Sequence, residues 1–105
     1  MDKQFKQMEN EVIKWFLKNC NVDFSLGGFR YITYILTKRL LNKWTEENVT
    51  IQYEKTAEYF NVTSSIVQRN IKHFISTFEH NTTNSKFLAK TYYLIKIYLD
   101  ENQRS

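Results

Sequence analysis

The segment 59–78 carries Arg69, Lys72 and His73 and contains no acidic residue. Gln68 directly precedes Arg69, so an amide and a guanidinium are adjacent, with Lys72 and His73 one helical turn later. In the major groove of DNA, Arg pairs bidentately with guanine and Gln with adenine, and cationic side chains bind phosphates. These residue types at this spacing therefore have the chemistry for contacting a nucleic acid.

Charge is unevenly distributed along the chain, which has a formal net charge of +4. Residues 24–45 contain four basic residues and no acidic one, whereas acidic residues gather in 46–58 and at the C-terminus. A polyanionic partner fits this separation, and so do ordinary helix faces exposed to solvent. The four basic residues are Arg30, Lys38, Arg39 and Lys43.

The stretch TAEYFNVTSSIVQRNIKHF, residues 56–74, has the pattern of a helix-turn-helix unit. Ala57 is small enough to let a second helix cross closely, and Asn61 tolerates the left-handed backbone that the turn requires. Thr63 can cap the second helix through its hydroxyl. Three apolar residues supply the plug between the helices and the inner face of the second helix: Val62, Val67 and Ile71.

The second helix of this unit would present a polar outer face. Short side chains at Ser64 and Ser65 would let its N-terminal end approach a groove, and a helix N-terminus favours a phosphate. An ordinary helical hairpin with a solvated face has the same amphipathic spacing, but few such hairpins combine the small residue, the turn residue, the cap and the core positions. We therefore interpret residues 64–73 as a DNA recognition helix.

Apolar residues recur at helical spacing along the whole chain and predict an all-α fold of about five helices. The absence of proline and the presence of only two glycines support this class. Two of the helices form the central helix-turn-helix, at about 51–60 and 64–78. The others are predicted at 3–18, 29–43 and 85–99.

Three of these helices have candidate N-capping residues. Asp2 would cap the first helix, and Thr50, at the end of the connector TEENVT, would cap the third. Either Asn84 or Ser85 would cap the last helix. The length of 105 residues predicts one domain, 1–105.

Several functional classes find little support in the sequence. Cys20 is the only cysteine, so we expect no internal disulfide and no cysteine-based metal site, which suits a reducing bacterial cytoplasm. His73 and His80 have no metal-ligand spacing with it, and no catalytic triad, carboxylate pair or Gly-rich phosphate loop stands out. We therefore expect no enzyme, no metal and no cofactor. The first residues lack the uninterrupted apolar core of a signal peptide, and no apolar run approaches the roughly 20 residues of a membrane span, so we expect neither feature.

The stretch YEKTAEYFNVTSSIVQRNIKHFI resembles the C-terminal DNA-binding domain of the master sporulation response regulators of endospore-forming bacteria. GGFRYITYIL and TNSKFLAK, at 83–90, resemble other parts of that family in the same order. The resemblance implies an all-helical domain that binds double-stranded DNA as a transcription factor, often in pairs on tandem or inverted sites. No receiver domain accompanies it here, so control by an aspartyl phosphate in the same chain is not expected.

The candidate site has two groups of residues, a recognition-helix group and a group of phosphate contacts. Within the first group, the resemblance implies that base and backbone contacts are made by Gln68, Arg69, Lys72 and His73. The full recognition-helix group is Thr63, Ser64, Ser65, Ile66, Gln68, Arg69, Lys72 and His73. The candidate phosphate contacts are Arg30, Tyr53, Ser85 and Lys86. Ile66 stands where the family tends to have a basic contact and Gln68 where it tends to have an acid, so the family's target sequence is not expected to carry over.

Protein partners are a second class of hypothesis. The apolar Ile66 at an exposed position favours a protein-interaction module, for example an inhibitor of a host protein encoded by a phage or mobile element, that reuses the same fold. The last helix is aromatic on several sides and is either a core strut or an interface. Because its apolar residues cannot all face one small core, we predict a homodimer through residues 85–99. The apolar residues that cannot all face the core are Tyr92, Tyr93, Leu94 and Ile97.

Overall fold

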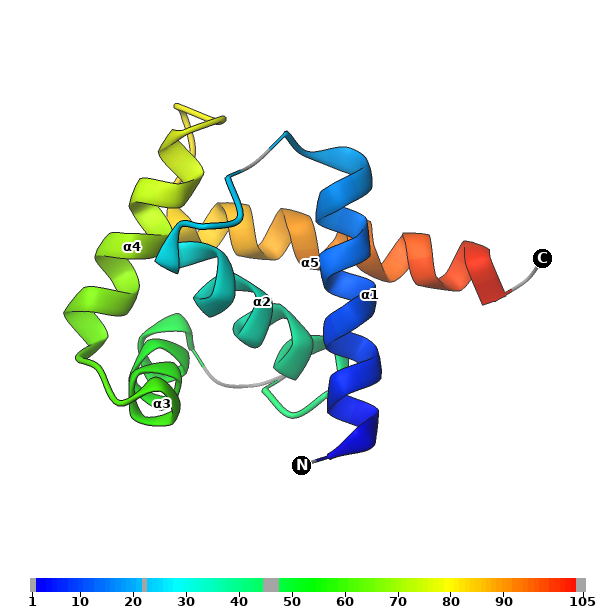
Figure 1. Cartoon of the computed structure of the whole chain (residues 1–105), viewed down its shortest axis with the longest axis horizontal. Helices are drawn as coiled ribbons and strands as arrows, with labels where there is room; N and C mark the ends of the chain where they lie inside the picture. The colour runs from blue at the N-terminus through cyan, green and yellow to red at the C-terminus, as the bar shows by residue number, and fades with distance from the viewer. Residues whose placement is uncertain (1, 22, 45–47, 104–105) are drawn as a thin grey trace.

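The computed structural model describes residues 2–21, 23–44 and 48–103, which form an all-α fold of five helices (Figure 1). The helices are α1 (Lys3–Asn19), α2 (Gly27–Leu40), α3 (Val49–Phe60), α4 (Ser64–Ser76) and α5 (Asn84–Gln103). The predicted fold class and order of helices are therefore confirmed. No helix in the described ranges combines the length and the apolar run that crossing a bilayer requires.

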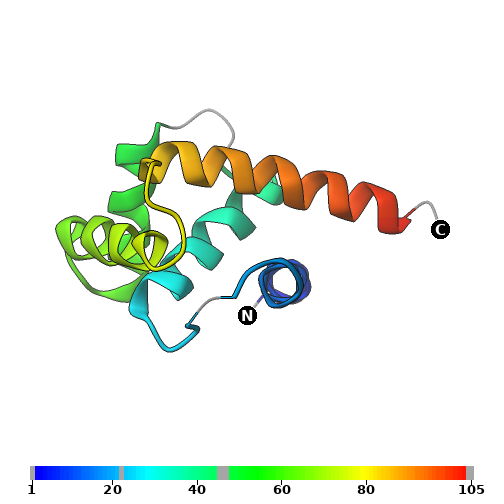
Figure 2. The same cartoon turned by 90° about the horizontal axis from the view of Figure 1, so that it is seen from above.

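α2 is the central helix, and the other helices pack around it (Figures 1 and 2). From Gly28 to Thr37 every residue except Arg30 is buried. The buried hydroxyls of Thr33 and Thr37 donate hydrogen bonds to the carbonyl oxygens four residues earlier, at 2.8 and 2.6 Å. These bonds satisfy polar groups inside the core, which is how a helix containing threonines can be buried on nearly all sides.

α2 crosses α4 at very close range at Gly28. A Cβ atom added at Gly28 would lie 2.1 Å from the main-chain oxygen of Asn70 and 2.8 Å from the Cβ atom of Phe74. Only glycine permits this approach, because a side chain would occupy the space that the backbone of α4 fills. The Phe74 ring also packs against Phe29, with ring centroids 5.6 Å apart. These contacts fix α4 against the central helix.

The prediction that the second helix extends to Lys43 is wrong, and so is its predicted start, since α2 begins two residues earlier. α2 ends at Leu40 because Asn42 adopts a left-handed backbone with φ of 60°. The amides of Asn42 and Lys43 donate to the carbonyls of Arg39 and Lys38, at 3.0 and 2.9 Å. This is the pattern of a Schellman motif, in which Asn is the most favourable residue after Gly.

Asp2 caps α1 as predicted, since its Oδ1 accepts a hydrogen bond from the amide of Gln4 at 2.9 Å. Thr50 does not cap α3. Asn48 does so instead, accepting from the amide of Ile51 at 3.0 Å, so α3 begins at Val49. Residues 45–47 of the predicted connector lie outside the described residues.

The last helix is capped by Thr83, not by Asn84 or Ser85. The Thr83 hydroxyl accepts a hydrogen bond from the amide of Lys86 at 3.1 Å. Asn84 is therefore the first residue of α5 and not its cap. α4 ends at Ser76, two residues before the predicted end, in a turn that leads toward α5.

α5 lies across the core and continues past it. Its inner residues Phe87, Leu88 and Ile95 are buried, and its C-terminal end projects beyond the other helices (Figure 2). The ammonium of Lys18 lies 5.7 Å from the ring centroid of Tyr98, which links the end of α1 to α5. The N-terminal end of α5 lies beside α4, where it meets the predicted recognition helix.

Candidate nucleic-acid interface

α3, the turn and α4 have the helix-turn-helix geometry that the sequence predicts. Ala57 is 5% exposed on α3, and Asn61 adopts the left-handed conformation with φ of 58° and ψ of 48°. The hydroxyl of Thr63 caps α4 by accepting from the amide of Ile66 at 3.2 Å. Val67 on the inner face of α4 is fully buried, as is Ile71. Each residue assigned to the frame of the motif therefore has the environment that its role requires.

The outer face of α4 presents most of the predicted recognition residues to solvent. Ser64 is half-buried, and Ile66 is 36% exposed at the N-terminal end of the helix. No acidic residue lies on α4, so cationic and amide side chains dominate this face. The predicted polar recognition residues that are exposed, including the cap, are Thr63, Ser65, Gln68, Arg69, Lys72 and His73.

A hollow of about 420 Å³ lies beside α4, where α3 and α5 begin. It brings together Gln68 and Lys72 from the recognition-helix group with Tyr53 and Ser85 from the candidate phosphate contacts. The remaining lining residues come from the starts of α3 and α5 and the turn before α5, namely Val49, Thr50, Thr82, Thr83 and Asn84. Two helix N-termini and a lysine at one hollow form an environment that favours a negatively charged group.

Tyr53 lines this hollow and is only 5% exposed. Burial raises the pKa of its phenol, while a hydrogen bond with the Asn84 side chain and the charge of Arg39 lower the pKa. Arg39 is itself partly buried and donates from Nε to the Gln52 side chain at 2.8 Å. The Tyr53 hydroxyl is thus part of an internal polar network, an arrangement that helical spacing alone did not predict.

The other two candidate phosphate contacts lie outside the hollow. Arg30 is exposed on α2, and its guanidinium lies over the Phe60 ring, 5.2 Å from the centroid, next to the turn of the motif. Lys86 is exposed on the first turn of α5. Both carry a cation at the edge of the surface that α4 presents.

Asn84 is the residue of this region whose contacts sequence analysis missed. It was assigned to capping, but its Nδ2 donates to the main-chain oxygen of Gln68 at 3.2 Å, across 16 positions of sequence. The only signal in the sequence was its place in TNSKFLAK, a segment whose first residue, Thr83, already offers a capping hydroxyl.

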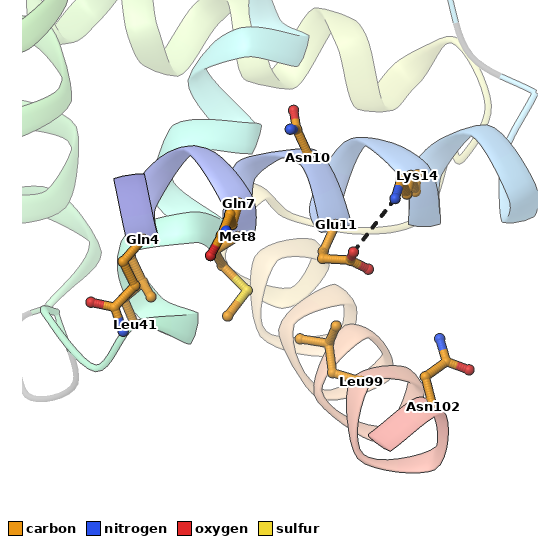
Figure 3. A pocket seen from close by; sticks show the side chains of 9 residues that line it. All are labelled: Gln4, Gln7, Met8, Asn10, Glu11, Lys14, Leu41, Leu99 and Asn102. Carbon is orange, nitrogen blue, oxygen red and sulfur yellow. Dashed lines mark ion pairs between the residues drawn. The ribbon is translucent and has the colours of Figure 1, made fainter. Parts of the chain in front are cut away.

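A second hollow, of about 560 Å³, lies between α1 and the end of α5 (Figure 3). Its lining includes no residue of α4. Amide side chains such as Gln7 and Asn102 surround an apolar part formed by Met8 and Leu99. The carboxylate of Glu11 pairs with the Lys14 ammonium at 3.6 Å, as the dashed line in Figure 3 marks. The lining therefore offers apolar contacts and amide groups for hydrogen bonding, while the carboxylate of Glu11 is already paired with Lys14.

The remaining reactive side chain is Cys20, which is half-buried at the end of α1. Burial raises the pKa of its thiol, and the charge of Glu79 raises it further. A thiol in this environment is protonated at neutral pH and is a weak nucleophile. Within the described ranges, no three His, Cys, Asp or Glu side chains are grouped so as to hold a metal ion.

Comparison with known families identifies the family to which this sequence belongs. Residues 13–97 match the family model described as sporulation initiation factor Spo0A C terminal. No curated protein and no solved structure matches the chain. The matched segment includes the whole of α2, α3 and α4, the C-terminal part of α1 and most of α5. The chain therefore belongs to the family of the C-terminal, DNA-binding domain of the sporulation initiation factor Spo0A.

Proposed function

We propose that this protein is a sequence-specific transcriptional regulator that inserts α4 into the major groove of DNA. The observation that carries the proposal is the outer face of α4, where Gln68, Arg69 and Lys72 are exposed on a helix without an acidic residue. Gln68 and Arg69 are assigned to base edges, and Lys72 and His73 to bases or the adjoining backbone. A regulator of this kind acts on the chromosome, so the proposal includes the bacterial cytoplasm as its location.

The phosphate contacts in this proposal flank the recognition helix on two sides. Ser85 and Lys86, at the start of α5, would contact the backbone beside the hollow, and Arg30 would contact it beside the turn. Tyr53 would act through Asn84 and not directly, because its ring is buried. Cationic contacts of this kind supply affinity that does not depend on sequence and that falls as salt rises.

The experiment is selection of binding sites from a pool of random duplexes, followed by fluorescence anisotropy on the enriched duplex and on a scrambled duplex of equal composition. We expect the enriched duplex to bind at least about a hundredfold more tightly, within the usual range for specific over non-specific binding. Enrichment of no sequence, with equal affinity for both duplexes, would contradict sequence-specific regulation. That result would show that the domain binds DNA without sequence preference.

We also propose that two copies bind together on DNA, through residues 85–99 of α5. One helix-turn-helix unit presents a single recognition helix, and such units usually gain affinity from two half-sites about one helical turn apart. Tyr93, Leu94 and Ile97 are 63%, 43% and 53% exposed, which is unusual for neighbouring apolar residues on one helix. A dimer through this helix would remove these side chains from water.

A second candidate function is a protein-interaction module that uses the outer face of α4. The observation that favours it is Ile66, an apolar residue that is 36% exposed at the end of the helix where short polar residues suit a groove. Ile66→Lys separates the two functions. It should strengthen DNA binding if α4 faces phosphates and should leave DNA binding unaffected if the face serves a protein.

A further inference from the structure

The amide of Asn84 connects the three helices that form the interface. Its Nδ2 donates to the main-chain oxygen of Gln68, near the middle of α4, at 3.2 Å. The same side chain is hydrogen-bonded to the phenol of Tyr53, which is buried on α3. Asn84 is also the first residue of α5, because Thr83 provides the cap. One short side chain therefore ties the start of α5 to both helices of the motif.

This connection lies at the candidate contact surface. The bonded carbonyl belongs to Gln68, whose side chain lines the hollow together with Ser85. Ser85 and Lys86 immediately follow Asn84 and are exposed on the first turn of α5. Since Asn84 is anchored to α4 by this hydrogen bond, we infer that it helps to fix the orientation of that first turn relative to α4.

We propose that Asn84 is a positioning residue for DNA binding, which holds the first turn of α5 in register with the recognition helix so that both contact the same duplex. The inference rests on the proposed function, because it concerns the same surface. Asn84 itself has no assigned contact with DNA. Its effect passes through Ser85 and Lys86, whose phosphate contacts need the first turn of α5 to keep its orientation. A contact held in place in advance costs less ordering when the complex forms.

The test compares Asn84→Ala with Asn81→Ala, a matched loss of an exposed asparagine in the turn before α5. Binding to the enriched and scrambled duplexes is measured from roughly 50 to 300 mM salt, well below the melting temperature of each variant. We expect Asn84→Ala to weaken binding to both duplexes about three- to tenfold, the range expected for one lost hydrogen bond. The slope of log K against log salt should fall by about 0.9, the value for one phosphate contact. Asn81→Ala should leave both quantities unchanged.

Tyr53→Phe adds a second readout, because it removes the hydroxyl that bonds to Asn84 and keeps the buried ring. It should weaken binding in the same direction, and the double variant should be no weaker than Asn84→Ala alone, since both remove one network. A variant that is partly unfolded loses active protein but keeps the salt slope, so the slope separates positioning from simple destabilisation.

Two outcomes would overturn the inference while leaving the proposed function intact. If the wild-type protein binds DNA and Asn84→Ala binds with the same affinity and salt slope, the connection has no role in binding. A lower melting temperature with an unchanged slope would show a purely structural role. Failure of the wild-type protein to bind any duplex would instead overturn the proposed function itself, and the inference with it.

Discussion

Gly28→Ala tests the contact that holds the recognition helix in place. The added Cβ would lie 2.1 Å from the main-chain oxygen of Asn70 and 2.7 Å from its carbonyl carbon. Ordinary van der Waals contact begins near 3.4 Å, so α2 and α4 must separate by about 1.3 Å in that direction. The neighbouring atoms belong to helix backbone and cannot rotate away, so the whole of α4 must move.

The expected cost follows from the size of that displacement. Overpacking a core usually costs about 1–3 kcal/mol, and a clash with backbone belongs at the upper end of this range. The better helix propensity of Ala recovers at most about 1 kcal/mol. We therefore expect a net loss of about 2 kcal/mol in the free energy of unfolding, or a melting temperature lower by roughly 8–16 °C for a domain of this size.

Gly27→Ala is the control, because a Cβ at Gly27 meets no atom within 4 Å. It should stabilise the protein by about 0.4–1 kcal/mol through the reduced freedom of the unfolded chain. Thermal unfolding followed by circular dichroism at the helix band measures both variants under one set of conditions. Equal melting temperatures for the two variants would refute the close crossing of α2 and α4. DNA affinity of Gly28→Ala should also fall, since α4 is displaced from its place on the surface.

The remaining predictions concern the turn, the recognition helix and assembly. Asn61→Val should destabilise the protein by about 1–2 kcal/mol because a β-branched residue is strained in the left-handed region, whereas Asn61→Gly should be tolerated; similar melts for Val and Gly would contradict the turn geometry. Arg69→Ala should cost about 1–3 kcal/mol on the enriched duplex and relax preference at one base position, while an equal loss on all duplexes would reassign Arg69 to a phosphate. Tyr93→Glu should abolish the mass increase that light scattering detects on a two-site duplex, and a wild-type protein that stays monomeric there would exclude the dimer.

The helices and the helix-turn-helix could be predicted because their signals are local. Asn61 and Thr63 act on the backbone next to them, so their roles follow from residue type and position. The wrong helix ends arose where two local signals compete. Asn42 ended α2 through a left-handed turn within an apolar run, and Asn48 took the capping role expected of Thr50.

What the sequence did not predict depends on contacts between distant residues. Periodicity cannot say which helix becomes central, so the burial of Thr33 and Thr37 in α2 was not foreseen. Tyr53 is a candidate phosphate contact, and the sequence does not show that its ring is buried or that its phenol is hydrogen-bonded to the side chain of Asn84, 31 positions later. Asn84 does not cap α5 because Thr83 does, and its side chain is free to bond to the main chain of α4 instead.

The most direct test of the central claim is a titration of ¹⁵N-labelled protein with the enriched duplex, followed by amide chemical shifts. Binding of DNA by the outer face of α4 predicts that the largest changes fall at 63–73 and 84–86, with smaller ones near Arg30. The hollow between α1 and the end of α5, including Gln7 and Asn102, should remain unperturbed. Changes centred on any other face, with residues 63–73 unaffected, would contradict the claim that α4 is the recognition helix.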